Sequence, residues 1–325
     1  MGSGQLRLIT VGTAEPELMR LSPWTARGML VIAAAAWGGG YTFSKIALES
    51  LSVQWMMSCR LCLSTLIMVA LLWRRIRRTH LPHLIVPGVL LGVSYWAAFM
   101  FQMRGLEVTE PGRNAFLTAT YCVFVPFLVW IVTRQRPAAR HILAALICLF
   151  GVGFIAIPKL GEGLSLGQGD VLSLIGAVLF AGNLVLSGMF AKKFDMLMLT
   201  LIEFLTAAML FTSGALITDP LPGAGDFTWT TIASLAYLII ASTLIAQNFQ
   251  NLAFSKVPAA QGSLILCTES LFGLLFSVLL VHEQVTATSF VGFALIFLAI
   301  VLSEIRLRRR PRTPRPMTGP RADVL

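Results

Sequence analysis

The sequence predicts an all-α membrane protein in which ten transmembrane helices form two inverted five-helix repeats. Composition, the apolar runs and an uneven distribution of Lys and Arg lead to this prediction. The chain has 325 residues, of which 56% are hydrophobic and only 12% are charged, and its mean hydropathy is +0.79. A soluble domain carries about 25% charged residues. This composition therefore excludes ordinary soluble, disordered and disulfide-scaffold proteins.

Ten apolar runs are long enough to cross a membrane. A hydrocarbon core of about 30 Å requires roughly 20 helical residues. The connections between the runs are mostly short and leave no room for a soluble domain. We expect spans at residues 28–48, 53–73, 84–103, 112–132, 140–158, 170–190, 196–217, 229–250, 258–281 and 286–305.

The distribution of basic residues gives the orientation. The net charge is +10, with 25 Lys and Arg against 15 Asp and Glu. With the N-terminus in the cytoplasm, 20 of the 25 basic residues lie at the cytoplasmic side and 3 lie outside. Cytoplasmic loops of membrane proteins are enriched in Lys and Arg. We therefore expect both termini to be cytoplasmic, with an N-terminal segment over 1–27 and a basic tail over 306–325 that touches anionic lipid. We expect no nucleic-acid partner.

The two halves of the chain resemble each other. FQMRGLEVTEPGRNAFL begins at residue 101, and the similar FQNLAFSKVPAAQGSL begins at residue 249. Trp37 aligns with Phe180, and 23 residues further on Arg60 aligns with Glu203. Because each half holds five spans, an odd number, the second half enters the membrane from the opposite side. We predict one repeat over 28–158, an external linker over 159–169, and a second repeat over 170–305.

A family resemblance follows from these residues. Trp37-Gly38 with Phe43 and Lys45, Arg60 in the second span, AFLTATYCVFVPFL at 115–128 and HEQVTATSFVGFALIFLAIVLSE at 282–304 resemble the EamA family of the drug/metabolite transporter superfamily. The resemblance implies an inner-membrane carrier of small metabolites, commonly amino acids moving outward. It also implies a central cavity. Arg134 departs from the family, which often has an acidic residue there.

Ionisable residues inside a membrane are costly and are candidates for function. Glu269 lies near mid-depth, where it could hold a proton, meet a substrate amine or make a structural hydrogen bond. Lys45 could reach the lipid headgroups or receive a substrate carboxylate. Arg60 and Glu203 lie at similar depths, as an intramembrane charge pair or as two separate packing contacts.

Polar and aromatic residues within the spans predict a central cavity that binds the substrate. The alternative for each residue is a packing contact between helices. The candidates are Trp37, Lys45, Trp96, Gln102, Asn114, Thr118, Tyr121, Asn183, Gln247, Gln250 and Glu269.

The predicted function is secondary transport of a small metabolite, an amino acid or related compound, by alternating access in the export direction. A membrane sensor that binds a ligand without moving it is the alternative. An intramembrane enzyme has little support, because the chain contains no HExxH or GxSxG motif.

We expect no catalytic residue, cofactor or metal, since the five cysteines lie in apolar runs, where Cys packs as a small hydrophobe. The bilayer and a small molecule are the expected partners, and a homodimer is left open.

Overall fold

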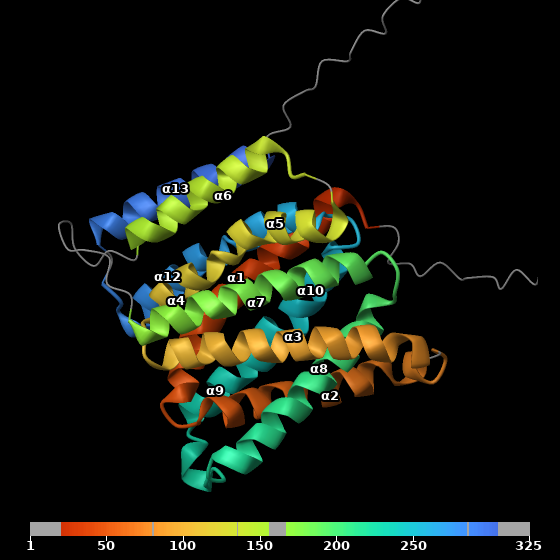
Figure 1. Ribbon diagram of the computed structural model, residues 1–325. Coiled ribbons are helices and arrows are strands. Elements are labelled where there is room, and N and C mark those ends of the chain that lie inside the picture. Colours follow the sequence, from red (N-terminus) through yellow and green to blue (C-terminus); the bar gives the residue numbers. More distant parts are fainter. Residues whose placement is uncertain (1–20, 80, 135, 156–166, 285, 305–325) are drawn as a thin grey trace, which may run out of the picture.

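The computed structural model describes residues 21–79, 81–134, 136–155, 167–284 and 286–304, and helices are the only regular secondary structure within these ranges (Figure 1). Most of the predicted N-terminal segment 1–27, most of the linker 159–169 and the whole tail 306–325 lie outside the described residues. The elements are α1 (Pro23–Leu48), α2 (Val53–Ile76), α3 (Pro82–Glu107), α4 (Pro111–Ala119), α5 (Tyr121–Thr133), α6 (Ala139–Ile155), α7 (Gln168–Phe190), α8 (Met196–Thr218), η2 (Ala224–Asp226), α9 (Trp229–Tyr237), η3 (Leu238–Ile245), α10 (Ala246–Ala253), α11 (Ala259–Leu266), α12 (Glu269–Val281) and α13 (Ala287–Glu304).

Seven helical runs in the described part of the chain are long and apolar enough to cross a membrane: α2, α3, α4–α5, α7, α8, α9–η3–α10 and α11–α12. α1, α6 and α13 are not among these seven runs, for two reasons. α1 has 26 residues, but Gly38, Gly39, Gly40 and several polar side chains dilute its hydropathy. The apolar stretches of α6 and α13 are short, over Ala139–Gly151 and Phe290–Ala299. Each of the ten predicted spans nevertheless coincides with one helix or one interrupted helix.

Helix starts follow local capping chemistry. The side chains of Ser22, Ser52, Asp195 and Thr228 accept a hydrogen bond from a backbone N–H in the first turn of α1, α2, α8 and α9. These bonds satisfy donors that have no partner inside the helix. Proline occupies the first position of α1, α3 and α4, where its missing N–H costs nothing.

Two membrane-length helices are interrupted at similar places. α4 gives way to α5 at Thr120, and α11 gives way to α12 at Cys267 and Thr268. Both following helices have 13 residues, and both end at a residue in the left-handed region, Arg134 (φ 58°) and His282 (φ 57°). The third long run of the second half is continuous but contains the π-helix η3, a form that is frequent at functional sites.

The packing brings the two predicted halves into direct contact. α1 packs against α12 and against the α9–η3–α10 run, while α7 packs against α3, α4 and α5. α2 packs against α8, and α6 pairs with α13 along one flank of the bundle (Figure 1). At Gly38, an added Cβ would lie 2.4 Å from the Cβ of Phe272, so only glycine allows α1 and α12 to approach this closely.

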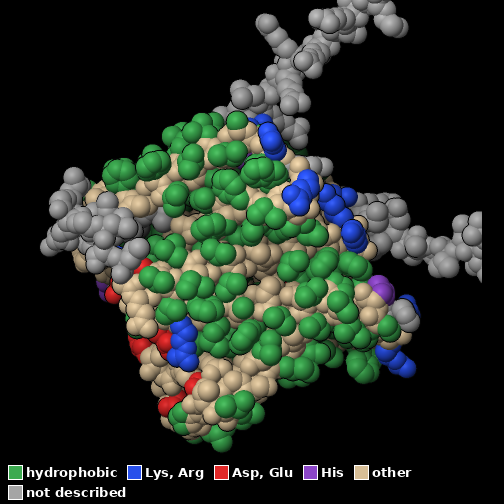
Figure 2. Space-filling model, in the orientation of Figure 1, with side chains coloured by type: hydrophobic (Ala, Val, Ile, Leu, Met, Phe, Trp, Pro, Cys, Tyr) green, Lys and Arg blue, Asp and Glu red, His purple; other side chains and the backbone are tan. Residues whose placement is uncertain are grey.

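The two ends of the bundle differ in charge. Figure 2 shows apolar side chains over the flank and most of the visible Lys and Arg at one end, whereas at the other end Asp and Glu lie together with a smaller basic group. The basic end is formed by the start of α1, α3 and α8 and the end of α2 and α7, and it carries Arg27, Arg74, Arg77, Arg78, Lys192 and Lys193. The acidic end is the opposite one and carries Glu49, Glu107, Glu110, Asp219 and Asp226.

Candidate functional site

A cavity lies inside the bundle between helices of both predicted halves. Its volume is about 40 Å³, which is room for two or three water molecules. Its wall combines aromatic rings with hydroxyl, amide and charged side chains. The lining residues are Trp37, Gly40, Tyr41, Ser44, Arg60, Phe99, Gln102, Met103, Thr118, Tyr121, Phe180, Asn183, Leu184, Ser242, Gln247, Gln250 and Glu269.

Arg60 places a positive charge in the wall of this cavity. Its side chain is buried, with 1% of its surface exposed. Nε donates to Thr243 Oγ1 at 2.5 Å, and Nη2 donates to the hydroxyl and carbonyl oxygens of Ser242 at 3.1 and 3.3 Å. The guanidinium lies 5.1 Å from the ring centroid of Phe99, a cation–π contact. Since all these partners are neutral, the charge remains available to an anion in the cavity.

Glu269 places a carboxylate on the same cavity. It is the first residue of α12, directly after the interruption, and only 4% of it is exposed. Tyr41 donates its hydroxyl to Glu269 Oε1 at 3.3 Å, and Gln102 Nε2 donates to the Tyr41 oxygen at 3.0 Å. The interruption matters because the first residue of a helix lies at the positive end of the helix dipole, which stabilises a negative charge.

Other cavity hydroxyls are available to a bound molecule. The Ser44 oxygen is buried and has no hydrogen-bond partner among the described residues. The Tyr121 hydroxyl lies near Glu269 without reaching hydrogen-bond geometry. Buried polar atoms normally have a partner, so these groups point to water or a ligand in the cavity. Trp37 instead donates Nε1 to the Ser242 carbonyl at 2.7 Å, which holds its ring against η3.

Glu203 lies one layer behind the cavity rather than on its wall. Its carboxylate is fully buried and accepts from Asn183 at 3.3 Å, Gln247 at 3.4 Å and Asn251 at 3.1 Å. Asn183 and Gln247 line the cavity, so Glu203 supports the wall from behind. The suggested Arg60–Glu203 charge pair is not formed. Arg60 binds hydroxyl and carbonyl groups of η3 while amides satisfy Glu203.

Three further predicted cavity residues do not line this cavity. Lys45 Nζ donates to the carbonyl oxygens of Leu106, Glu107 and Thr109 at 2.9, 3.0 and 2.9 Å, because free carbonyls at the end of α3 attract a cation. Asn114 donates to Ser173 Oγ at 2.7 Å and ties α4 to α7.

Trp96 is the third of these residues, and its ring packs edge-on against Phe211 with centroids 6.4 Å apart. The other candidates line the cavity: Trp37, Gln102, Thr118, Tyr121, Asn183, Gln247, Gln250 and Glu269.

Sequence reasoning missed several wall residues. Tyr41 and Ser44 follow Trp37 by four and seven positions, a spacing that places all three on one helix face and could have revealed them. Ser242 had no such signal. Its carbonyl oxygen accepts hydrogen bonds from Trp37 and Arg60, and it lies in a π-helix that the sequence pattern does not predict.

Polar contacts tie the helices together at both ends of the cavity. At the acidic end, Arg113 forms a two-point ion pair with Asp170, with both N–O distances 2.8 Å, and borders an open pocket of about 620 Å³ together with Lys45. At the basic end, Arg75 Nε and Nη2 bind Asp195 at 2.9 and 2.7 Å. An ion pair between the two predicted halves therefore lies at each end of the bundle.

Glu283, in the connection after α12, adds another contact at the acidic end. It accepts from the Gly112 N–H at 3.0 Å and from the Ser277 hydroxyl. Burial raises the pKa of the Glu283 carboxyl above its ordinary value, and the two hydrogen bonds oppose that rise. The contact joins the connection after α12 to the start of α4.

Known proteins resemble this chain in sequence and in fold. It matches the sequence model of the EamA-like transporter family over residues 25–157 and again over 167–305. An uncharacterised transporter of Archaeoglobus fulgidus is 26% identical over 282 residues, which cover 86% of this chain and 85% of that protein. The uncharacterised transporter YoaV of Bacillus subtilis is 22% identical over 239 residues, which cover 72% of this chain and 80% of that protein. A solved crystal structure superposes with a TM-score of 0.70 over 87% of this chain and 97% of its own; at 15% identity this shows a shared fold.

Proposed function

The chain belongs to the EamA-like transporter family, and from this premise we propose that it exports a small zwitterionic metabolite, an amino acid or related compound, by alternating access. The observation that carries the proposal is the pair of opposite charges on one cavity wall. Arg60 offers a guanidinium for a carboxylate, and Glu269 offers a carboxylate for an amine. Aromatic rings of Trp37, Phe99 and Phe180 provide apolar surface for the rest of the molecule.

Alternating access requires that the cavity open to one side at a time. A substrate can pass only if helices separate at the side to which the cavity opens. The ion pairs Arg113–Asp170 at the acidic end and Arg75–Asp195 at the basic end cross between the predicted halves. We infer that the structure corresponds to a closed state and that one pair breaks when the cavity opens to its side.

Two inverted repeats of five helices would supply the moving parts. The two separate family matches, over 25–157 and 167–305, support this division. The contacts are consistent with it, because α1 packs on the third and fourth helices of the second half while α7 packs on the third and fourth of the first. In this proposal α1, α6 and α13 join the seven apolar runs to make ten crossings.

The orientation places the basic end in the cytoplasm and the chain in an inner membrane, with both termini cytoplasmic. The gathering of Lys and Arg at one end supports this orientation (Figure 2). The same orientation puts the pocket beside Lys45 and Arg113 on the external side, where an exported molecule would leave.

The test compares metabolites in the medium of cells that produce the wild-type chain, Glu269→Gln or the control Glu49→Gln, at matched membrane levels. Glu49 is an exposed carboxylate in the connection after α1, so its variant controls for loss of a negative charge. We expect the wild type and Glu49→Gln to raise one class of zwitterion outside the cells, and Glu269→Gln to lose that effect. Equal export by Glu269→Gln would remove Glu269 from the site. No change with any chain would overturn export and favour uptake or ligand sensing.

A further inference from the structure

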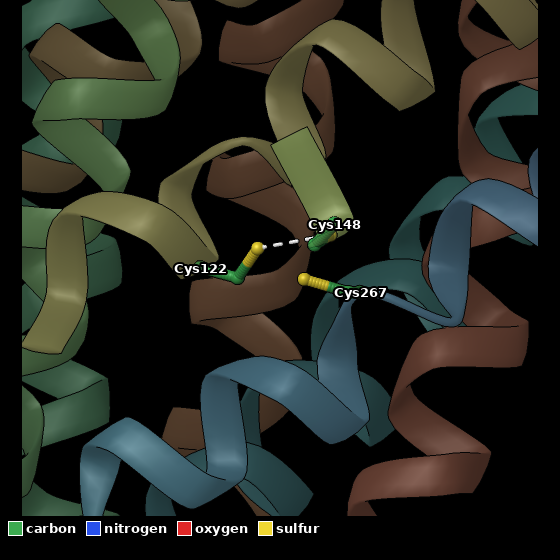
Figure 3. A group of neighbouring side chains, drawn as sticks. All are labelled: Cys122, Cys148 and Cys267. Atoms are coloured by element: carbon green, nitrogen blue, oxygen red, sulfur yellow. Dashed lines mark hydrogen bonds between the residues drawn. The ribbon is translucent and has the colours of Figure 1, made fainter. Parts of the chain in front are cut away.

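Three cysteine side chains converge at a buried point outside the cavity. Cys122 lies in the first turn of α5, Cys148 in α6, and Cys267 between α11 and α12. Their sulfur atoms all lie within 4.8 Å of one another, and those of Cys122 and Cys148 are 3.2 Å apart. Figure 3 shows the three sulfur atoms facing a common centre from three separate segments. Three soft ligands around one point are the arrangement that a three-coordinate thiophilic ion requires.

We propose that Cys122, Cys148 and Cys267 form a binding site for a trivalent thiophilic metalloid, with arsenic(III) as the representative ion. The ligand chemistry excludes hard cations, because Mg²⁺ and Ca²⁺ select oxygen ligands. Thiolates instead select soft ions. The number of sulfur ligands equals the number of bonds that a trivalent metalloid forms.

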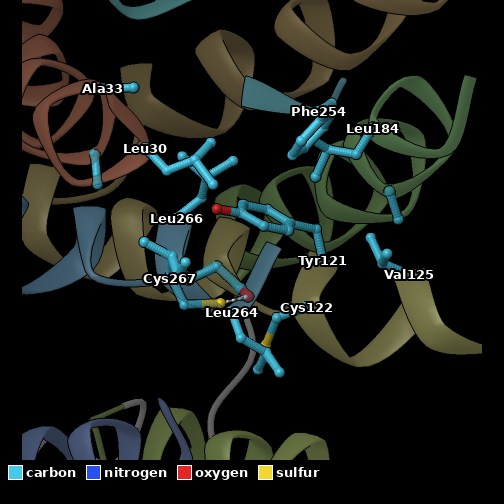
Figure 4. Close-up of a cluster of buried hydrophobic side chains, with 14 of the residues drawn as sticks. Leu30, Ala33, Tyr121, Cys122, Val125, Leu184, Phe254, Leu264, Leu266 and Cys267 are labelled. Atoms are coloured by element: carbon cyan, nitrogen blue, oxygen red, sulfur yellow. Dashed lines mark hydrogen bonds between the residues drawn. The ribbon is translucent and has the colours of Figure 1, made fainter. Parts of the chain in front are cut away.

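The apolar surroundings favour the soft ion whose complex with three thiolates has no net charge. All three cysteines have no exposed surface, and they belong to the same buried hydrophobic cluster as Val125, Leu264 and Leu266, part of which Figure 4 shows. A net charge buried in such a cluster is costly. Three thiolates around Cu(I) would leave two negative charges, and around Zn(II) they would leave one. Around arsenic(III) they leave none, so neutrality favours the trivalent ion.

The binding reaction is balanced without an oxidant or reductant. Arsenous acid, As(OH)₃, exchanges three As–O bonds for three As–S bonds. The three thiol protons leave with the three hydroxyl groups as water, so neither arsenic nor sulfur changes oxidation state. Reactants and product are uncharged, and no net charge enters the apolar cluster at any stage.

The site would join the interruptions of both halves. Cys267 donates its thiol to the carbonyl of Ala119 at 3.3 Å, directly beside the interruption at Thr120. Cys267 also lies two residues before Glu269. A bound arsenic atom would therefore connect α5 and α6 to the segment that positions the Glu269 carboxylate. This inference stands independently of any substrate of the cavity.

The experiment uses the full chain with Cys59→Ala and Cys62→Ala, which leaves only the three converging cysteines. The purified, phosphine-reduced protein is titrated with arsenite, and bound arsenic, remaining free thiols and the arsenic X-ray absorption spectrum are measured. We expect one arsenic per chain, loss of all three thiols and three sulfur neighbours around arsenic. Adding Cys148→Ala should weaken binding at least tenfold, because one of the three As–S bonds is lost.

Several outcomes would overturn the proposal. These are substoichiometric arsenic, a spectrum with fewer than three sulfur neighbours, or full binding by the Cys148→Ala chain. Displacement of the arsenic by one equivalent of Cu(I) or Zn(II) would overturn the choice of a trivalent ion. If Cys148→Ala fails to fold, the spectrum of the three-cysteine chain still decides, since it needs no further substitution.

Discussion

Arg60 and Glu203 occupy matching places in the two sequence halves, yet they have different surroundings. Both are buried, in α2 and α8 respectively, with 1% and 0% of their surfaces exposed. Arg60 faces the cavity and contacts neutral oxygens and an aromatic ring. Glu203 lies behind the wall and accepts from three amide groups. Matching places in the two halves therefore do not give matching roles. Arg60 donates to Ser242 and Thr243 of the second half, whereas the partners of Glu203 all lie in its own half.

The two residues differ in whether their charge is already bound by the protein. The Glu203 carboxylate has three amide donors, whereas the Arg60 guanidinium has no counter-ion in the described part of the chain. Three N–H donors satisfy Glu203 without a counter-ion. The guanidinium of Arg60 has no carboxylate within ion-pair distance among the described residues. A buried charge without a counter-ion is normally unfavourable for stability. Its presence beside a cavity supports a role in binding an anionic group.

The largest effect is expected from exchanging the two charges. Arg60→Glu and Glu203→Arg should each abolish transport, and the double variant should not recover, because the side chains do not touch. The control is the corresponding exchange at Arg75 and Asp195, an observed ion pair, whose double variant should recover part of the lost activity. Transport of the compound found in the medium is measured in proteoliposomes. Recovery by the Arg60–Glu203 double variant would restore the charge-pair interpretation.

Arg60→Met should separate function from stability. A hydrogen bond to a charged group contributes about 1.5–3 kcal/mol, so substrate affinity should fall roughly 10- to 100-fold. The melting temperature should stay constant or rise, since an uncompensated buried charge is removed. Substrate binding and thermal unfolding in detergent give both values. A chain that binds normally but unfolds at a lower temperature would show that Arg60 is structural.

Glu203→Gln should give the reverse pattern. The amide that replaces the carboxylate has its own N–H donors, which face the donors of Asn183 and Asn251, so the free energy of unfolding should fall by about 1–3 kcal/mol. Substrate affinity per folded molecule should change less than about twofold. Glu49→Gln, at an exposed position, serves as the control with unchanged stability. A large loss of affinity with normal stability would place Glu203 in the binding site.

Helix positions could be predicted because membrane hydrocarbon imposes a simple demand on sequence. Roughly 20 apolar residues are needed for each crossing, so runs such as 84–103 and 196–217 match α3 and α8. The interruptions were not predicted, although polar residues mark both: Thr118 and Thr120 in the first, and Thr268, Glu269 and Ser270 in the second. Isolated polar residues also occur inside uninterrupted spans, such as Ser94 in α3 and Thr206 in α8, so they did not single out these two places.

Side-chain direction was the harder part of the site. A polar residue in a span could face the cavity, another helix or a helix end, and sequence alone ranks these poorly. Lys45 illustrates this, because its amine binds carbonyls at the end of α3. Glu269 was placed near mid-depth by counting along its span, but its position at the start of α12 depends on an interruption that counting could not reveal.

The smallest effect on substrate binding is expected from removing the Ser44 hydroxyl, and Ser187, which does not line the cavity, provides the comparison. Ser44 and Ser187 are both buried, and neither oxygen has a hydrogen-bond partner among the described residues, but only Ser44 lines the cavity. Ser44→Ala should weaken substrate binding about 2- to 10-fold, as expected for one hydrogen bond of roughly 0.5–1.5 kcal/mol. Ser187→Ala should leave binding unchanged, and calorimetric titration of the purified chains measures both. Equal effects of the two variants would mean that the Ser44 hydroxyl does not contact the substrate, and Ser44 would then be a packing residue like Ser187.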